Sequence, residues 1–207
     1  PLNAILGYAR IASGGVLTGA KLSRAIEIIE RNAEASGRII DDLLDLSRLE
    51  SEGFTPELAV IEIEPLVREL ADSWAGEARD KGLELQTAVE AGLAVHADRR
   101  LLYQALENLV ENAIRYVPEG SRVRVEARRV PGGIELSVAD DGDGIPREDQ
   151  ARIFERFYRV EKGRARTSGG TGLGLAIVKH VAEAHGGRVE LDSAPGRGAT
   201  FRITLPE

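Results

Sequence analysis

The sequence contains no cysteine, which excludes disulfide bonds, thiol catalysis and cysteine-ligated zinc. Aromatic residues are few, with four Phe, four Tyr and one Trp, so the core must be aliphatic. No apolar run reaches the roughly 18 residues that a membrane-spanning helix needs. The three histidines, His96, His180 and His185, have no metal-binding spacing, and we expect His180 and His185 to lie at the surface or at an interface.

Positive charge is in deficit as well, because the net charge is −7, and this argues against a nucleic-acid-binding surface. Apolar residues make up 43% and charged residues 29%, a balance typical of a globular protein and not of a disordered one. Methionine is also absent and the chain begins at Pro1. We therefore expect this chain to be a piece of a longer protein.

Residues 1–52 are predicted to form a helical hairpin. Apolar residues recur every three or four positions from Leu2 to Ala12, and a second pattern with steps of four and three runs from Leu22 to Ser47. Such alternating steps are typical of a helical bundle. The apolar face is wider than one hairpin can bury, which favours pairing of two copies through residues 1–52 in a four-helix bundle. The alternative is a hairpin that packs on the rest of its own chain.

A polar, proline-containing segment at 53–57 is the predicted linker, and residues 58–207 alternate between strand and helix patterns. Strands are expected at 58–63, 83–89, 122–128, 133–140, 188–192 and 199–205. Helices are expected at 64–81, at 99–116 with Asp98 as N-cap, and at 172–185 with Gly186 and Gly187 ending it. The implied fold class is α+β, with the helical hairpin followed by a mixed sheet that carries helices on one face, an α/β sandwich.

Four glycines fall within residues 169–174, directly before an apolar helical pattern. Glycine lacks a Cβ, so such a loop can turn sharply and bring its N–H groups against a ligand. The helix that follows presents its positive dipole end at the same place. The pattern predicts a phosphate site, although glycine loops also occur as plain turns. Its spacing differs from the dinucleotide-binding G-x-G-x-x-G, and the residues before it are polar and basic instead of strand-like.

Four further motifs accompany this loop, at residues 108–116, 140–146, 153–159 and 196–201. In their order and separations, the five motifs resemble those of the sensor histidine kinases of two-component signalling. These kinases share an ATPase superfamily with gyrase, heat-shock chaperones and mismatch-repair proteins. The resemblance covers essentially the whole chain. It implies a dimerisation and phosphotransfer hairpin at 1–52 and a catalytic ATP-binding domain of the gyrase/histidine kinase type at 58–207.

The resemblance implies ATP and Mg²⁺ as cofactors. Asn112 matches the magnesium-binding asparagine, and an amide oxygen suits this hard ion. Asn108 lies one turn earlier, where hydrolytic members of the superfamily carry a glutamate that activates water. An amide is a poor base, which favours phosphoryl transfer, although Glu107 and Glu111 flank the asparagines and leave a base role open.

The same resemblance assigns the other site residues. Arg115 and Arg159 match basic positions near the phosphates and are expected, with Asn108, to serve catalysis. Asp140, at the end of a predicted strand, matches the aspartate that accepts a hydrogen bond from the amine of adenine. The other expected nucleotide-binding residues are Tyr116, Gly142, Gly144, Gly170, Gly172, Leu173, Gly174 and Thr200.

Two segments between these motifs also carry expectations. Phe154 and Phe157 match a phenylalanine motif, and we expect both in the core. The polar, basic segment 160–170, with Lys162, Arg164 and Arg166, is expected to form a lid over the nucleotide.

Kinases of this kind phosphorylate a histidine on the first hairpin helix. Residues 1–5 resemble the end of that motif, so we expect the acceptor histidine five residues before Pro1 and no autophosphorylation by this chain alone. The implied reaction is in-line attack of the imidazole on the γ-phosphoryl group, followed by transfer to an aspartate of a response-regulator receiver domain docked on the hairpin. We expect a cytoplasmic location, no membrane contact by this part of the chain, and a parent protein either free or anchored in the cell membrane.

Three other functions stay open. A hydrolytic ATPase of the same superfamily is disfavoured by Asn108 and the hairpin, and a non-catalytic dimerising scaffold by the intact glycine motifs, Asp140 and Asn112. A kinase acting on serine is conceivable because some mitochondrial kinases share the ATP fold, but the proline-led start of the first helix favours histidine.

Overall fold

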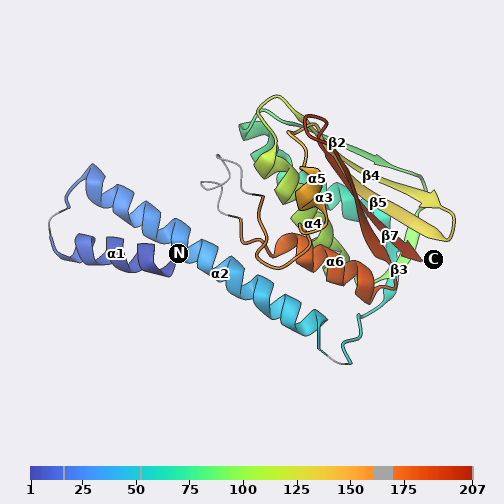
Figure 1. Ribbon diagram of the computed structural model, residues 1–207, viewed down its shortest axis with the longest axis horizontal. Helices are drawn as coiled ribbons and strands as arrows, with labels where there is room; N and C mark the ends of the chain where they lie inside the picture. Colours follow the sequence, from blue (N-terminus) through green and yellow to red (C-terminus); the bar gives the residue numbers. More distant parts are fainter. Residues whose placement is uncertain (16, 52, 161–169, 207) are drawn as a thin grey trace.

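The first two helices form an antiparallel hairpin that projects from the rest of the molecule (Figure 1). The structure is a computed structural model that describes residues 1–15, 17–51, 53–160 and 170–206. Helix α1 spans Leu2–Ser13 and α2 spans Ala20–Leu49. Helix α1 buries no residue, and α2 buries only Ala25 and Leu46. The predicted hairpin is thus confirmed, with most of its apolar side chains uncovered.

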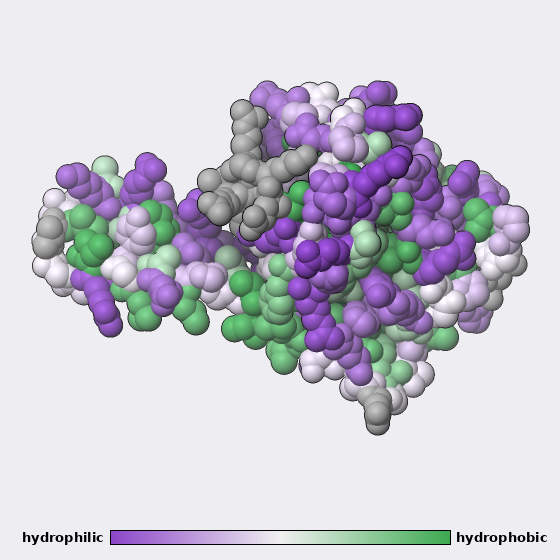
Figure 2. All heavy atoms as spheres, viewed as in Figure 1, coloured by the Kyte–Doolittle hydropathy of each residue, from purple (hydrophilic) through white to green (hydrophobic). Residues whose placement is uncertain are grey.

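The uncovered side chains lie along both helices of the hairpin, and Figure 2 shows them as green atoms among polar ones. The large apolar residues exposed there are Leu2, Leu6, Tyr8, Ile11, Ile26, Ile40, Leu43 and Leu44. Along the described residues, no helix has the length and apolar character required to cross a membrane.

A small two-stranded sheet follows the hairpin. Strand β1, Ala59–Glu62, pairs antiparallel with β3, Ala94–Ala97, and helix α3, Ile63–Asp80, begins directly after β1. Strand β1 was expected, but its partner β3 was not. Strand β3 has only four residues, between a turn and Asp98, the N-cap of the next helix, and so short a strand gives no clear alternating pattern.

The main sheet has five strands in the order β2-β4-β5-β7-β6. They are β2 Glu84–Val89, β4 Arg122–Val130, β5 Gly133–Asp140, β6 Arg188–Ser193 and β7 Ala199–Pro206. The β2–β4 pair is parallel and the other three pairs are antiparallel, so the sheet is mixed as predicted. Alternate residues of β4 and β7 are buried, as expected for strands with one face on the core, whereas β5, in the middle of the sheet, buries residues of both faces.

Helices α3, α4 (Arg99–Tyr116) and α6 (Gly174–Ala184) cover one face of this sheet (Figure 1), while a single turn, α5 (Arg147–Gln150), lies in the loop after β5. The predicted α+β fold class and α/β sandwich are confirmed. Helix α4 contributes eight buried aliphatic residues and is the centre of the core. The motif at residues 108–116 is therefore carried by a helix that is packed in the core.

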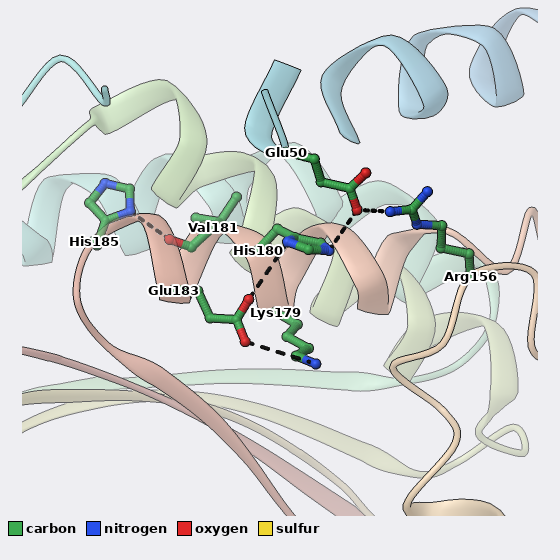
Figure 3. Close-up of polar contacts among 7 residues, drawn as sticks. All are labelled: Glu50, Arg156, Lys179, His180, Val181, Glu183 and His185. Atoms are coloured by element: carbon green, nitrogen blue, oxygen red, sulfur yellow. Dashed lines mark hydrogen bonds and ion pairs between the residues drawn. The ribbon is translucent and has the colours of Figure 1, made fainter. Parts of the chain in front are cut away.

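His185 was expected at the surface or at an interface, and the expectation of a surface position was wrong. Its side chain is buried, with Nδ1 2.7 Å from the carbonyl oxygen of Val181 and Nε2 2.9 Å from the backbone N of Asp98. Because Nε2 accepts from a backbone N–H, the proton must sit on Nδ1 and be donated to Val181 (Figure 3). The carboxylate of Asp98 caps α4 as predicted, through the N–H of Leu101 at 3.1 Å.

Candidate nucleotide-binding site

A cavity of about 940 Å³ opens between α4, the loop after β5, the glycine loop and helix α2. Most of the residues predicted to form a nucleotide site line it: Asn108, Asn112, Arg115, Tyr116, Asp140, Gly142, Gly144, Arg159, Gly170, Gly172 and Gly174. Two predicted residues do not. Leu173 is fully buried in the core, and Thr200 alternates on β7 with Ala199 and Phe201, which do line the cavity.

Helix α4 presents Asn108 and Asn112 to the cavity, because residues four apart lie on the same helix face. A Cβ on Gly174 would lie only 2.8 Å from Oδ1 of Asn108. The first turn of α6 can therefore approach this amide closely only because residue 174 is glycine. The N-terminal end of α6, with its unpaired N–H groups, faces the same cavity.

The glycine loop is held in a shape that side chains would prevent. Gly172 has φ +74°, and a Cβ there would lie 2.9 Å from the Cα and C atoms of Phe157. Its carbonyl oxygen accepts a hydrogen bond from the N–H of Phe157 at 2.8 Å. A Cβ on Gly170 would lie 3.0 Å from both Nη1 of Arg115 and the hydroxyl of Tyr116. This bare backbone beside a helix N-terminus has the properties of a phosphate cradle.

Asp140 ends strand β5 and lines the same cavity. Its Oδ1 accepts a hydrogen bond from the N–H of Gly142 at 2.8 Å. Burial raises the pKa of this carboxyl, and hydrogen bonds from the N–H groups of Gly142 and Ala199 oppose the rise. The turn that follows is tight, since a Cβ on Gly144, at φ +68°, would lie 2.0 Å from the carbonyl oxygen of Ala194.

The C-terminal end of α4 carries Arg115 and Tyr116 into the cavity. Arg115 forms an ion pair with Glu111, and Tyr116 remains 49% exposed. No glycine caps this helix end. Instead Nζ of Lys81, at the end of α3, donates to the carbonyl oxygens of Ile114 and Arg115. An ammonium group at this end also complements the helix dipole, so Lys81 caps the C-terminal end of α4.

The phenylalanine motif divides into one core residue and one surface residue. Phe154 packs edge-to-face on Phe201, with ring centroids 6.2 Å apart. Phe157 was expected in the core, but it is 59% exposed and has φ +61°. The left-handed backbone turns its side chain outward while its N–H reaches the glycine loop. The predicted lid lies, from residue 161 to 169, outside the described residues.

Sequence reasoning missed one wall of the cavity, which belongs to the hairpin. Arg38, Asp41 and Asp42 of α2 line it, and Oδ2 of Asp42 accepts a hydrogen bond from Oγ1 of Thr171 at 2.9 Å. Burial raises the pKa of Asp42, the bond from Thr171 opposes this, and the nearby carboxylate of Glu111 adds to it. Acidic residues flanking an otherwise apolar stripe of α2 were the available signal.

Within the described residues no group of three or more His, Cys, Asp or Glu side chains is arranged to hold a metal ion. Asn112 lines the cavity and offers an amide oxygen, a suitable ligand for a magnesium ion that also keeps phosphate oxygens and water.

Fold and cavity together define an ATPase-type domain joined to a helical hairpin. The family described as histidine kinase-, DNA gyrase B-, and HSP90-like ATPase matches residues 97–207, and the His Kinase A (phospho-acceptor) domain matches residues 1–52. The chain belongs to the sensor histidine kinase family of two-component systems.

Individual relatives agree with this assignment. The sensor-like histidine kinase SenX3 of Mycolicibacterium smegmatis is 44% identical over 82% of this chain and 44% of its own length. SenX3 of Mycobacterium tuberculosis is 40% identical over 98% of this chain and 49% of its own length. The chain thus spans about half the length of these relatives. Among solved structures, full-length ShkA in complex with AMPPNP has a TM-score of 0.77 at 34% identity, covering 100% of this chain and 43% of that chain.

Proposed function

We propose that this chain is the kinase core of a two-component sensor histidine kinase, with a phosphotransfer hairpin at 1–52, a linker at 53–57 and an ATP-binding domain at 58–207. The observation that carries the proposal is the convergence, on one cavity, of a strand-end carboxylate, two helix asparagines and a glycine cradle. Family membership and the AMPPNP complex of ShkA support ATP as the nucleotide.

Each residue group has a distinct task in this proposal. Asp140 accepts a hydrogen bond from the amine of adenine, while Tyr116, Gly142 and Gly144 surround the base. The cradle from Gly170 to Gly174 binds the phosphates through backbone N–H groups. When bound, Mg²⁺ neutralises phosphate charge, and Asn112 supplies one oxygen ligand. Leu173 contributes to binding by anchoring the cradle in the core.

Three residues are assigned to the transfer step. Asn108 lies against the start of α6 and orients the terminal phosphate without activating water, because an amide is not a base. Arg115 and Arg159 carry positive charge toward the phosphates, which stabilises the charge that develops during transfer. The attacking imidazole belongs to a histidine N-terminal to Pro1, on the helix that continues into α1. None of the three histidines of this chain lies on the hairpin.

Two partners complete the cycle. A second copy of the chain covers the exposed apolar side chains of α1 and α2 to form a four-helix bundle. A response-regulator receiver domain then takes the phosphoryl group from the histidine. We place this core in the cytoplasm, with the parent protein free or anchored in the membrane. Thr200 reaches the adenine through water, because its neighbours Ala199 and Phe201, and not Thr200 itself, line the cavity.

A hydrolytic ATPase is the second candidate, and one observation favours it. Glu107 lines the cavity beside Asn108, and burial, with the nearby Glu111, raises the pKa of its carboxyl. A carboxylate with a raised pKa is a stronger base and can activate water.

Labelling distinguishes the candidates. Binding is followed first through the fluorescence of Trp74, the only tryptophan and a cavity-lining residue, during titration with Mg-ATP. The full-length protein is then incubated with γ-labelled ATP. Acid-labile label retained on the protein supports the kinase, and steady release of free phosphate without retained label supports the hydrolase. Absence of binding would refute both and leave a non-catalytic scaffold.

A further inference from the structure

Helix α2 packs along its C-terminal half against the nucleotide domain. Leu46, near the middle of this contact, is only 1% exposed. Acidic residues surround it on the same side of the helix. Asp42 accepts from Thr171 of the glycine loop at 2.9 Å, and Asp45 accepts from Gln104 of α4 at 2.7 Å. The contact is therefore a specific, polar-rimmed docking surface and not a loose apposition.

The last turn of α2 makes a second attachment to the glycine loop. Glu50 lies between Arg156, with which it forms an ion pair, and His180 of α6, whose Nε2 is 3.0 Å away (Figure 3). The residue after Arg156 is Phe157, whose N–H donates to the carbonyl oxygen of Gly172 at 2.8 Å. The hairpin thus holds the loop directly through Asp42 and indirectly through Glu50, eight residues further along the same helix.

We propose that Asp42, which the hairpin supplies, is a positioning residue of the nucleotide site. Its hydrogen bond to Thr171 fixes the glycine loop, and its negative charge repels a bound terminal phosphate. A nucleotide with this phosphate therefore opposes docking of the hairpin on the nucleotide domain. This inference rests on the proposed function of the cavity as an ATP site. It goes beyond it by making one wall of the site a residue of the hairpin.

The hydrogen-bond geometry carries the first half of the proposal. Oγ1 of Thr171 donates to Asp42 and at the same time accepts from the N–H of Leu173, at 3.1 Å. One hydroxyl therefore links the hairpin helix to the turn that enters α6. Thr171 lies between Gly170 and Gly172, so the position of its hydroxyl sets the position of the bare backbone on either side.

Electrostatics carries the second half. Asp42 is half-buried and is hydrogen-bonded to Thr171 of the proposed phosphate cradle. The nearby carboxylates of Asp41, Asp45 and Glu111 add negative charge around it. Each phosphate brought into the cradle adds repulsion at this point. ATP carries one more phosphate than ADP, so Asp42 must disfavour ATP relative to ADP. By linkage, ATP must weaken the docking of α2 by the same factor.

The test compares Asp42→Asn with Asp72→Asn. The asparagine at 42 keeps an oxygen that accepts from Thr171 but removes the charge, while Asp72 is an exposed residue of α3, so both variants change the net charge equally. Affinities for Mg-ATP and Mg-ADP are measured through Trp74 fluorescence. We expect Asp42→Asn to raise the ratio of ATP to ADP affinity about fivefold, as for two charges several Å apart in a partly screened site. Asp72→Asn leaves the ratio unchanged.

A second variant separates this effect from docking in general. Asp45→Asn also removes one negative charge and weakens the contact of α2 with α4, but Asp45 is not bonded to the glycine loop, so it should raise the ATP to ADP ratio clearly less than Asp42→Asn does. If Asp42→Asn leaves the ratio within twofold of wild type, or if Asp45→Asn raises it equally, the assignment of Asp42 is overturned. A wild-type chain that binds neither nucleotide overturns the proposed function instead.

A docking measurement checks the reciprocal prediction. The chain has no cysteine, so two introduced cysteines, one at exposed Glu30 and one at exposed Arg188, can carry a fluorescent donor and acceptor without background labelling. Doubly labelled chains are mixed with excess unlabelled chains, so that energy transfer reports distance within one chain. Mg-ATP should lower the transfer more than Mg-ADP, and Asp42→Asn should remove this difference. Equal responses to both nucleotides in the wild type would contradict the coupling.

Discussion

Replacement of Gly172 by alanine should disable the nucleotide cradle while leaving the fold largely intact. Alanine at φ +74° is strained by roughly 1–2 kcal/mol. Its Cβ would also lie 2.9 Å from backbone atoms of Phe157, which cannot rotate away. The loop must then shift, and the hydrogen bond from the N–H of Phe157 to Gly172, worth about 0.5–1.5 kcal/mol, is lost. Because tenfold in affinity corresponds to about 1.4 kcal/mol, we expect Mg-ATP binding to weaken at least tenfold.

Two other glycines separate strain from close approach. Gly92 has nearly the same φ, +73°, but a Cβ there would meet nothing within 4 Å, and Gly92 does not line the cavity. Gly92→Ala should therefore lose roughly 1–2 kcal/mol of stability and keep its affinity for ATP. Gly170→Ala would meet only the ends of the Arg115 and Tyr116 side chains, which can move, so its loss of affinity should be smaller than that of Gly172→Ala.

The assay combines Trp74 fluorescence during Mg-ATP titration with thermal unfolding of each variant. The expected order of affinities is wild type and Gly92→Ala together, then Gly170→Ala, then Gly172→Ala. Wild-type affinity in Gly172→Ala would refute the reasoning, because it would mean that the close backbone approach has no role in binding. A loss of affinity in Gly92→Ala as large as in Gly172→Ala would show that global strain, and not the cradle, controls binding.

Three further predictions concern single polar contacts. Asp140→Asn should abolish measurable ATP binding yet leave stability near neutral pH unchanged or higher. Burial raises the pKa of this carboxyl, so its contribution to stability falls as pH rises from the ordinary pKa of 3.8 through the raised pKa, whereas ATP affinity, which needs the ionised form, falls as pH drops through the same window. ATP titrations and unfolding experiments across this pH range check both signs. Lys81→Met should lower stability by about 1.5–3 kcal/mol because it uncaps α4, and it should weaken ATP binding because Tyr116 is the last residue of this helix. Lys81→Arg should restore both stability and affinity. If affinity for ATP survives in the methionine variant, the cap does not position the site. His185→Ala should lower the free energy of unfolding in urea by about 1–3 kcal/mol, since the N–H of Asp98 loses its buried acceptor, with ATP affinity retained; an unchanged urea midpoint would contradict this.

Local pattern was enough to predict most of the secondary structure. The eight buried residues of α4 recur at helical spacing, β4 and β7 alternate between buried and less buried residues, and Asp98 caps α4 where its type and position indicated. Gly172 and Gly186 have a left-handed backbone, and their residue type alone indicated positions where such a conformation is possible. These features depend on neighbours within a few positions, which the sequence contains explicitly.

Sequence alone determined the class of protein, the hairpin and the positions of the site residues along the chain. Only the tertiary structure decided which residues meet. His185 is buried because α6 ends against the start of α4, and Phe157 is exposed because its backbone must reach Gly172. Asp42 lines the cavity because α2 packs on a loop that lies 129 residues away in sequence. Such contacts arise from long-range packing, whose geometry leaves no periodic trace in the residues that make it.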